Sequence, residues 1–456
     1  MQQVFSKICL SLCMGIFLLC FSALNSFGQS PSSTPLTLTE AIQTAVSKNP
    51  KISAAGFQVE SSDAQITQAR SGLLPQIYFS EGYNHTTNPM WAFGTKLNQE
   101  QITQQDFDPA RLNDPDPINN FASTLSLNWS LYDSGQTRHG LKQAEIGKKM
   151  TALMLDRTRQ QVIAQTVAAY VGVLLAQKNL AVIEQTLETA RAHLKMVRAR
   201  FENGFVVKSD LLRAQVHIAD LDQQQLQAES QVQVALSFLN AAMGVPIDSG
   251  FELSSPLEAG NEVVGSLESW MEKALSLRPE IKQLQNQEMI AQEEISKSKA
   301  AHLPSVNLMG NYEFNTEDFS EWGDNYTVGA MVNLNIFSGR RLSARTVQAR
   351  AALNEVGARQ ADLKQGILVQ TRQAFLQAQS ARKRILVAAA AVTQAEETLR
   401  IVRNRYETGL LNIVALLDAE LALQHARTNH FKAAHDYKVA ATQLALAAGT
   451  IDEDFQ

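Results

Sequence analysis

Cysteine is scarce in this chain and is confined to one end of it. The sequence has three cysteines, Cys9, Cys13 and Cys20. Lys7 precedes an apolar run over residues 8–21, and Ser26-Phe27-Gly28 offers small residues for cleavage, which predicts a secretory signal over residues 1–28. Bulky Leu19 disfavours lipid attachment at Cys20. The expected mature chain has no cysteine, which excludes disulfides and thiolate metal sites.

Long apolar runs and blocks of like charge are also missing beyond residue 28. The longest apolar candidate, Ile385 to Val392, is far shorter than the roughly 18–20 residues that cross a bilayer as a helix. The net charge is −5, and no block of five or six like charges occurs, which argues against nucleic acid as a partner. If this exported chain meets a membrane, we expect it to do so without transmembrane helices.

Sequence motifs of catalysis are absent too. The chain has no G-x-S-x-G, G-x-x-x-x-G-K-[ST], G-x-G-x-x-G or H-E-x-x-H motif. His425, His430 and His435 recur at every fifth position, a spacing that turns each side chain away from the last on a helix. This spacing indicates that the three histidines are solvated helix residues and not a pair of metal ligands. We therefore expect no enzyme, no cofactor and no resident metal.

The sequence does contain an internal repeat, in which similar segments occur twice in the same order. "VRARFENGFVVKSDLLRAQ" at 197–215 is matched by "VRNRYETGLLNIVALLDAE" at 402–420. "LLPQIYFSEGYN" at 73–84 likewise resembles "HLPSVNLMGNYE" at 302–313. Such self-similarity indicates an internal duplication. The predicted organisation is a first repeat over 29–250, a linker over 251–266, a second repeat over 267–450 and a tail over 451–456.

Each repeat is predicted to contain two strands, at 76–84 and 121–132 in the first and at 305–314 and 325–337 in the second. In "FASTLSLNWSLY", Leu125, Leu127 and Trp129 alternate with polar residues, so one face of the strand is apolar and the other wet. A half-buried sheet in a soluble domain explains one such strand. Four strands of about ten residues in an exported chain favour an outer-membrane β-barrel.

Each repeat is also predicted to form a very long helical hairpin, over 136–243 in the first and over 340–449 in the second. Apolar residues keep heptad spacing in both, which predicts coiled coils; examples are Leu180, Ile183, Leu187, Ala190, Leu194 and Val197, and Ile385, Ala388, Val392, Ala395, Leu399 and Val402. Gly204 and Gly409 are placed to take the left-handed conformation that ends a helix, and so to turn the hairpins. The predicted fold class is mainly α with a small β part.

A sheet of four strands leaves open edges that lipid cannot satisfy, so other copies of the chain must close it. Two copies would supply eight strands, which enclose little room. Three copies would supply twelve, which leave a lumen. The long helices would then continue the barrel as a second tube.

The order of these features, doubled, resembles the TolC family of outer-membrane efflux proteins over essentially the whole mature length. The matching pieces are the starts before Pro50 and Pro279, the L-P-x strand entries at Pro75 and Pro304, the Y-D-S-G and F-S-G strand exits, and the R-(F/Y)-x-x-G tips. The resemblance implies a homotrimer in outer-membrane lipid, with a twelve-stranded β-barrel and a periplasmic α-helical barrel. It also implies two partners, a periplasmic adaptor and an inner-membrane transporter.

By the same resemblance, the hairpin tips carry the adaptor contacts. The implied contact residues are Arg200, Gly204, Phe205, Val206, Asp210 and Leu211 at one tip, and Arg405, Gly409, Leu410, Leu411 and Leu416 at the other. Exposed apolar side chains at a tip would favour a partner, although the glycines and leucines also serve to build the turn.

The family's periplasmic gate has two aspartates one turn apart. Here Asp418 occupies the second position and Ala415 the first. A three-fold ring of carboxylates would attract cations at the constriction, whereas the alternative is a solvated carboxylate on a helix surface. Arg403 and Arg405 are candidate latches of the closed state.

Three further readings stay open on the sequence alone. The segment 89–120 is expected to be a mobile extracellular loop, or a cover over the channel mouth. Asp106, Asp108, Asp114 and Asp116 could bind a divalent cation there, although their spacing fits no EF-hand. The duct could serve a type I protein secretion system instead of solute efflux. An alternative of another class, a periplasmic coiled-coil adaptor or scaffold, fits two equivalent halves with strands poorly.

Overall fold

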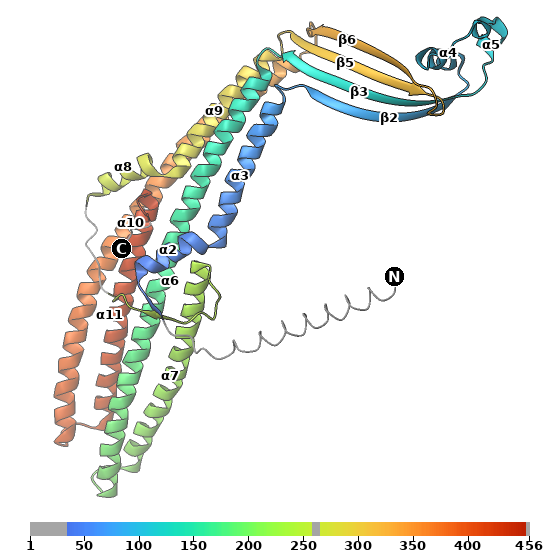
Figure 1. Cartoon of the computed structure of the whole chain (residues 1–456). Helices are drawn as coiled ribbons and strands as arrows, with labels where there is room; N and C mark the ends of the chain where they lie inside the picture. The colour runs from blue at the N-terminus through green and yellow to red at the C-terminus, as the bar shows by residue number, and fades with distance from the viewer. Residues whose placement is uncertain (1–33, 258–264, 453–456) are drawn as a thin grey trace, which may run out of the picture. The chain divides into compact units, whose positions relative to one another are not determined.

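The computed structural model describes residues 34–257 and 265–452, and its helices occur in matched pairs (Figure 1). The predicted signal with its cysteines lies outside the described residues, as do the middle of the predicted linker and the end of the tail. The pairs are α2 (Leu38–Lys48) with α8 (Leu267–Leu277), α3 (Pro50–Ser71) with α9 (Pro279–Ala300), α6 (Gln136–Glu202) with α10 (Arg341–Glu407), and α7 (Lys208–Met243) with α11 (Ile413–Ala448).

The paired helices have equal lengths, which confirms the duplication. The members of each pair have 11, 22, 67 and 36 residues respectively. The described chain divides into two compact units, one of residues 53–158 and 275–369 and one of the remaining residues. Each repeat contributes to both units, so the repeats of the sequence are not the units of packing. We call them the sheet unit and the hairpin unit.

The sheet unit contains one antiparallel sheet in the order β2-β3-β5-β6. Its strands are β2 (Gln76–Thr86), β3 (Ile118–Tyr132), β5 (Ser305–Thr316) and β6 (Gly323–Asn333). The predicted fourth strand ran to residue 337, and this end was wrong. Asn333 pairs with Ser305, the first residue of β5, and Pro304 before it has no N–H to offer. Residues 334–337 therefore have no strand beside them in β5.

The register of the sheet separates an apolar face from a polar one, as the alternation predicts. On one face Leu125 lies opposite Phe79 and Tyr312. On the other face Ser126 lies opposite Tyr78 and Asn311. Aromatic rings collect at one end of the apolar face, where centroids lie 4.4 to 6.5 Å apart; the group comprises Tyr83, Phe121, Tyr312, Phe314, Phe319 and Trp322.

The insertion between β2 and β3 is folded, which corrects the expectation of a mobile loop. It contains α4 (Pro89–Asn98), the 3-10 turn η1 (Gln104–Phe107) and α5 (Pro109–Asn113). Lys96 Nζ lies 2.7 Å from Asp106, and hydrogen bonds from Lys96 and Thr103 hold the pKa of that carboxyl well below its usual range. Gln99 donates to the carbonyl of Asn119 at 2.8 Å. These contacts fix the segment against β3.

The four aspartates of the insertion have structural partners or stand apart. Asp108 caps α5 by accepting from the backbone N–H of Ala110 at 3.0 Å, and Asp106 pairs with Lys96. Within the part of the chain that is described, no group of three or more His, Cys, Asp or Glu side chains is arranged to hold a metal ion. A divalent cation site in this segment, one of the sequence hypotheses, therefore has no support.

The hairpin unit contains a small parallel sheet that the sequence analysis did not predict, between β1 (Thr34–Leu36) and β4 (Phe251–Leu253). The hydroxyl of Tyr170, buried on α6, donates to the carbonyl of Leu36 at 2.8 Å. It also accepts from the N–H of Ser255 at 3.2 Å. One tyrosine thus ties α6 to β1 and to the segment after β4.

The apolar content of α6 also exceeds the sequence expectation. One 18-residue window of α6 reaches a mean hydropathy of 1.5, so this helix is long and apolar enough to cross a membrane by length and composition. Many of the apolar side chains of α6 are buried in the structure, among them Val162, Ile163, Val167, Tyr170, Val171, Val173 and Leu174. Because the core helix of a folded protein is apolar too, the hydropathy of this window is weak evidence of a membrane span.

Candidate docking tips and gate

The free ends of the two helical hairpins pack together around one apolar cluster (Figure 1). Its buried members come from all four long helices: Val197, Ala214, Leu399, Tyr406, Ile413, Leu416, Ala419 and Leu423. Val197 and Leu399 are among the heptad residues that the sequence predicts to pack. The cluster makes the two tips one packed end, and it sets the position of every candidate site residue below.

Both tips turn on a glycine in the left-handed conformation, with φ of 76° at Gly204 and 78° at Gly409. The backbone N–H of Phe205 bonds to the carbonyl of Arg200, and that of Leu410 to the carbonyl of Arg405, each at 2.9 Å. The same C-terminal hydrogen bonds therefore close both helices, as the prediction required. Arg405 takes part through its backbone, and its side chain is exposed.

The candidate contact residues divide into exposed and buried ones. Phe205 and Leu410 are 79% and 74% exposed and stand at equivalent places beyond the glycines. Val206 and Leu211 are half-buried against the apolar cluster, and Leu411 is half-buried as well. Asp210 lies in the first turn of α7. A partner at the tips would therefore meet Phe205 and Leu410 first.

Leu416 does not present a surface, although the resemblance put it among the contact residues. Its exposed fraction is 0%, because it fills the centre of the apolar cluster. The α11 helix begins at Ile413, so Leu416 lies on the same face, one turn in, and points with Ile413 into the packed end. Any effect of Leu416 on docking would pass through the packing of the tips.

Arg200 joins the first tip to the second. Its Nη1 and Nη2 donate to the carbonyls of Tyr406 and Glu407 at 3.0 and 2.5 Å. Its guanidinium also lies 5.2 Å from the centre of the Tyr406 ring. Burial raises the pKa of the Tyr406 hydroxyl. The family resemblance implied a partner contact for Arg200; in the structure it bridges the two hairpins.

The candidate gate residues occupy different environments. Asp418 is exposed and makes no ion pair with any described residue, and Ala415 lies one turn before it. Arg403 is half-buried, and its Nε has no hydrogen-bond partner among the described residues. Arg403 lines a cavity of about 250 Å³ together with Glu420, Gln424 and Arg427. Arg403 and Arg405 make no ion pair with any described residue, so their role as latches of the closed state stays a prediction.

Sequence reasoning missed a buried ionic cluster just inside the tips. Glu420 on α11 is 3% exposed and is in contact with Nδ1 of His193 on α6, while Nε2 of His217 on α7 lies 3.7 Å from its other oxygen. The available signal was the heptad pattern, because Glu420 falls between the core positions Leu416 and Leu423. The histidines that were considered lie further along α11, where His425 is exposed and His430 and His435 are half-buried.

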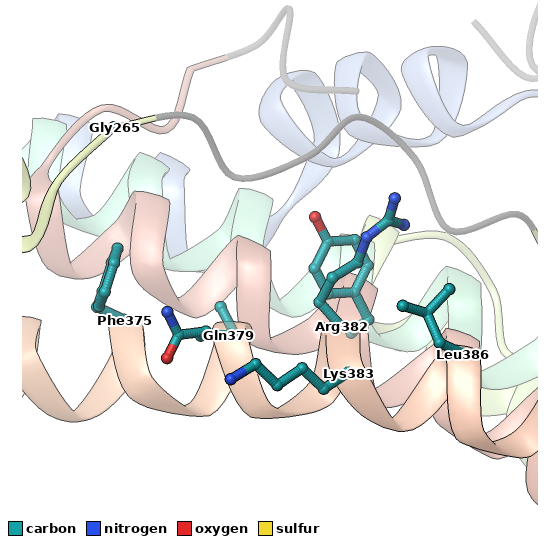
Figure 2. Close-up of a pocket in the computed structure, with 8 residues that line it drawn as sticks. Gly265, Phe375, Gln379, Arg382, Lys383 and Leu386 are labelled. Atoms are coloured by element: carbon teal, nitrogen blue, oxygen red, sulfur yellow. The ribbon is translucent and has the colours of Figure 1, made fainter.

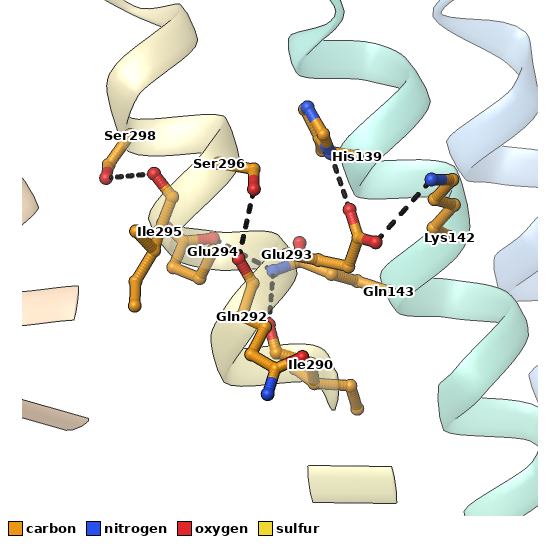
Figure 3. A network of polar contacts seen from close by, with 10 residues as sticks. All are labelled: His139, Lys142, Gln143, Ile290, Gln292, Glu293, Glu294, Ile295, Ser296 and Ser298. Carbon is orange, nitrogen blue, oxygen red and sulfur yellow. Dashed lines mark hydrogen bonds and ion pairs between the residues drawn. The ribbon is translucent and has the colours of Figure 1, made fainter. Parts of the chain in front are cut away.

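A polar network and a cavity lie along the helices away from the tips. In the sheet unit, His139 and Lys142 reach Glu293 at 2.5 and 3.6 Å, and Gln143 bonds to Glu294 at 3.0 Å (Figure 3). In the hairpin unit a cavity of about 400 Å³ is lined along α10 by Phe375, Gln379, Arg382, Lys383 and Leu386 (Figure 2). Neither place contains a candidate residue of the tips or of the gate.

The fold and the tips together define a class: a duplicated subunit with a small two-faced sheet and two long helical hairpins. Comparison with known proteins agrees. Residues 41–245 and 270–450, the bulk of both repeats, match the family of outer membrane efflux proteins. The chain belongs to this family, which makes it an outer-membrane transport protein and confirms the resemblance inferred from the doubled motifs.

Individual relatives are distant but match nearly full length. The chain is 25% identical to the alkaline protease secretion protein AprF of Pseudomonas aeruginosa, over 92% of this chain and 85% of AprF. It is 25% identical to the outer membrane protein TolC of Vibrio cholerae, over 91% of each. The crystal structure of the Campylobacter jejuni CmeC outer membrane channel is similar in fold, with a TM-score of 0.74 and 18% identity over 94% of this chain and 92% of that one.

Proposed function

We propose that this chain is the outer-membrane exit duct of a tripartite efflux system. Three copies would form a pore that passively conducts small molecules, such as drugs, metals or other toxic solutes. The solutes would enter from a periplasmic adaptor fed by an inner-membrane transporter. Because the chain carries none of the catalytic motifs sought, the transporter would supply the energy.

One observation carries the proposal: the sheet is two-faced and unclosed. Within the described residues β2 and β6 each pair with one strand only, so both outer edges of the sheet lack a partner. The unpaired backbone groups of such edges cannot be left in hydrocarbon. Closure against two further copies would satisfy them, place the apolar face toward lipid and leave the polar face around a lumen.

The deciding experiment is reconstitution of the purified protein in planar bilayers. We expect stepwise single-channel currents, and an oligomer on unboiled SDS gels that boiling converts to the single chain. A closed barrel resists the detergent because all its strand edges are paired, whereas a soluble coiled-coil scaffold would fractionate with the periplasm. A stable monomer in detergent that conducts no current would contradict the proposal.

The tips are the proposed docking surface for the adaptor, through Phe205 and Leu410. Exposed apolar side chains of this size at a free helix end favour a protein partner. We expect Phe205→Ser combined with Leu410→Ser to abolish co-purification of the adaptor and export, while the oligomer and its conductance persist. Leu226→Ser, at an exposed leucine on α7 well away from the tip, serves as the control. Undiminished adaptor binding by the double variant would remove the tips from the interface.

A second candidate function is the exit duct of a type I protein secretion system. The observation that favours it is the naming of two relatives that match 92% of this chain, AprF and the proteases secretion protein PrtF of Dickeya chrysanthemi. Both functions use the same duct, so the cargo must be measured. Deleting the gene should raise sensitivity to toxic solutes under the first function, and should remove specific polypeptides from the medium under the second.

A further inference from the structure

Three ionisable side chains from three helices meet in a nearly dry place inside the packed end of the hairpins. Glu420 exposes 2% of its side chain, His193 exposes 8% and His217 exposes 15%. Glu420 is on the second hairpin, and both histidines are on the first. The cluster is therefore a direct polar link between hairpins, about two to three turns of helix above the tips.

The other charges near this cluster are few and mostly engaged elsewhere. From α10 and α11, Arg403 and Arg427 line the same cavity as Glu420. Arg427 is held by Glu396 at 2.9 Å and Gln185 at 2.8 Å. Within one turn of the three residues, the remaining ionisable side chains are all exposed; they are Arg191, Lys195, Arg213, Asp220 and Asp418. The two imidazoles are thus the groups in contact with the buried carboxylate.

A buried carboxylate is stable only beside a positive charge or strong donors. Burial alone would raise the pKa of Glu420, but the contacts of His193 and His217 outweigh burial and lower it. Those contacts supply charge only while an imidazole carries its second proton. Histidine is the side chain whose charge changes most readily near neutral pH.

We propose that Glu420, His193 and His217 form a pH-sensitive clasp, which holds the two hairpins together in mild acid and loosens as the imidazoles lose their protons. The clasp goes beyond the transport function, because it makes the ease of separating the hairpins depend on pH. Loss of the second proton leaves the carboxylate buried without a cation, which weakens the packed end. Closing the duct in mild acid would be the functional consequence.

The sign of the pH effect follows from both partners. Because the pKa of Glu420 is lowered in the folded chain, its contribution is present above the ordinary glutamate range and is lost as pH falls through the lowered value. An imidazole supplies charge only while it carries its second proton, and it stops contributing once a rise in pH removes that proton. The clasp is therefore stronger in mild acid, where the carboxylate is charged and an imidazole can hold its second proton, than in mild alkali.

Hydrogen exchange of backbone amides in the full-length protein, held in lipid nanodiscs, measures the clasp directly. Rates at about pH 5.5 and about pH 8, each divided by the intrinsic rate at that pH, should show protection of residues 413–424 falling by about fivefold to tenfold at the higher pH. Glu420→Gln should remove this dependence, because a neutral amide does not distinguish the imidazole states. Glu188→Gln, which removes an exposed carboxylate on α6, should keep it.

His217→Gln provides a second variant, which keeps the His193 contact and should reduce the pH effect rather than abolish it. Equal protection at both pH values in the unaltered protein would overturn the clasp. So would an undiminished pH effect in Glu420→Gln or in His217→Gln. Because exchange reports the packing of the hairpins and not current, a clasp can fail while conduction stands, and the two failures are distinguishable.

Discussion

At the scale of the residue, the bridge made by Arg200 has a chemistry that other residues cannot copy. A guanidinium donates two hydrogen bonds in a fixed fork and stacks on an aromatic ring, and here it does both, to the carbonyls of Tyr406 and Glu407 and to the Tyr406 ring. Lysine offers one mobile ammonium. We therefore expect the bridge to require arginine at this position, and not merely a positive charge.

We expect Arg200→Ala to free the second tip, at a cost of about 1–2 kcal/mol in local stability. Residues 405–411 should then exchange their amide hydrogens about tenfold faster. Arg200→Lys should recover less than half of the protection, and Arg213→Ala, an exposed arginine on α7, should leave it unchanged. Full protection in Arg200→Lys would show that charge alone suffices.

Asp418 offers a second test at this scale. As an exposed carboxylate without a partner in the described chain, it would form a three-fold ring in the proposed pore and attract divalent cations. Asp418→Asn should raise the cation concentration that halves the single-channel current by about twofold to fivefold. Ala415→Asp, which adds a second carboxylate one turn earlier, should lower that concentration. Unchanged block in both variants would place Asp418 outside the constriction.

At the scale of the element, the end of α7 depends on one glycine for two reasons. Gly244 has a φ of 73°, and a Cβ there would lie 2.6 Å from the carbonyl oxygen of Lys48 and 2.7 Å from the Cα of Asn49. These are backbone atoms at the end of α2, and the Asn49 side chain donates to the carbonyl of Ala242 at 2.7 Å. The two helix ends are therefore locked closely together.

Gly244→Ala should lower the free energy of unfolding by about 2–4 kcal/mol, because both backbone conformation and space oppose a methyl group. Gly204→Ala is the matched control. It has the same left-handed conformation, with φ of 76°, but nothing within 4 Å of the added Cβ, so it should cost only about 1 kcal/mol. Thermal unfolding of the purified variants measures both. Equal costs would mean that close approach to α2 contributes nothing.

The elements differ in how far the sequence could predict them. Long hairpins and four strands follow from local periodicity, since heptads and alternation are written within each segment. The three-residue strands β1 and β4 carry no periodicity, and α4 is fixed by partners such as Asn119 that lie twenty residues away. Likewise, the tips could be found from their repeated motif. The heptad pattern marks Glu420 as a buried carboxylate but does not identify its partners, because His193 and His217 come from two other helices.

At the scale of the whole molecule, the proposed pore assigns an environment to each face of the sheet. Val328 on the apolar face and Thr327 on the polar face are neighbours near the middle of β6, and both are exposed in the single chain. In the closed barrel Val328 would meet lipid and Thr327 would meet water. Replacing either residue by lysine adds the same charge, but we expect assembly to fail at Val328 and to proceed at Thr327.

We expect Val328→Lys to cost about 2–4 kcal/mol, since an ammonium at mid-depth must leave water, and to deplete the oligomer from outer membranes. Thr327→Lys should assemble normally and shift the ion selectivity of the pore toward anions, because its charge enters the lumen. Immunoblots of membrane fractions and reversal potentials under a salt gradient measure the two outcomes. If both lysines are tolerated equally, the apolar face does not contact lipid, and closure of the sheet into a barrel loses its physical reason.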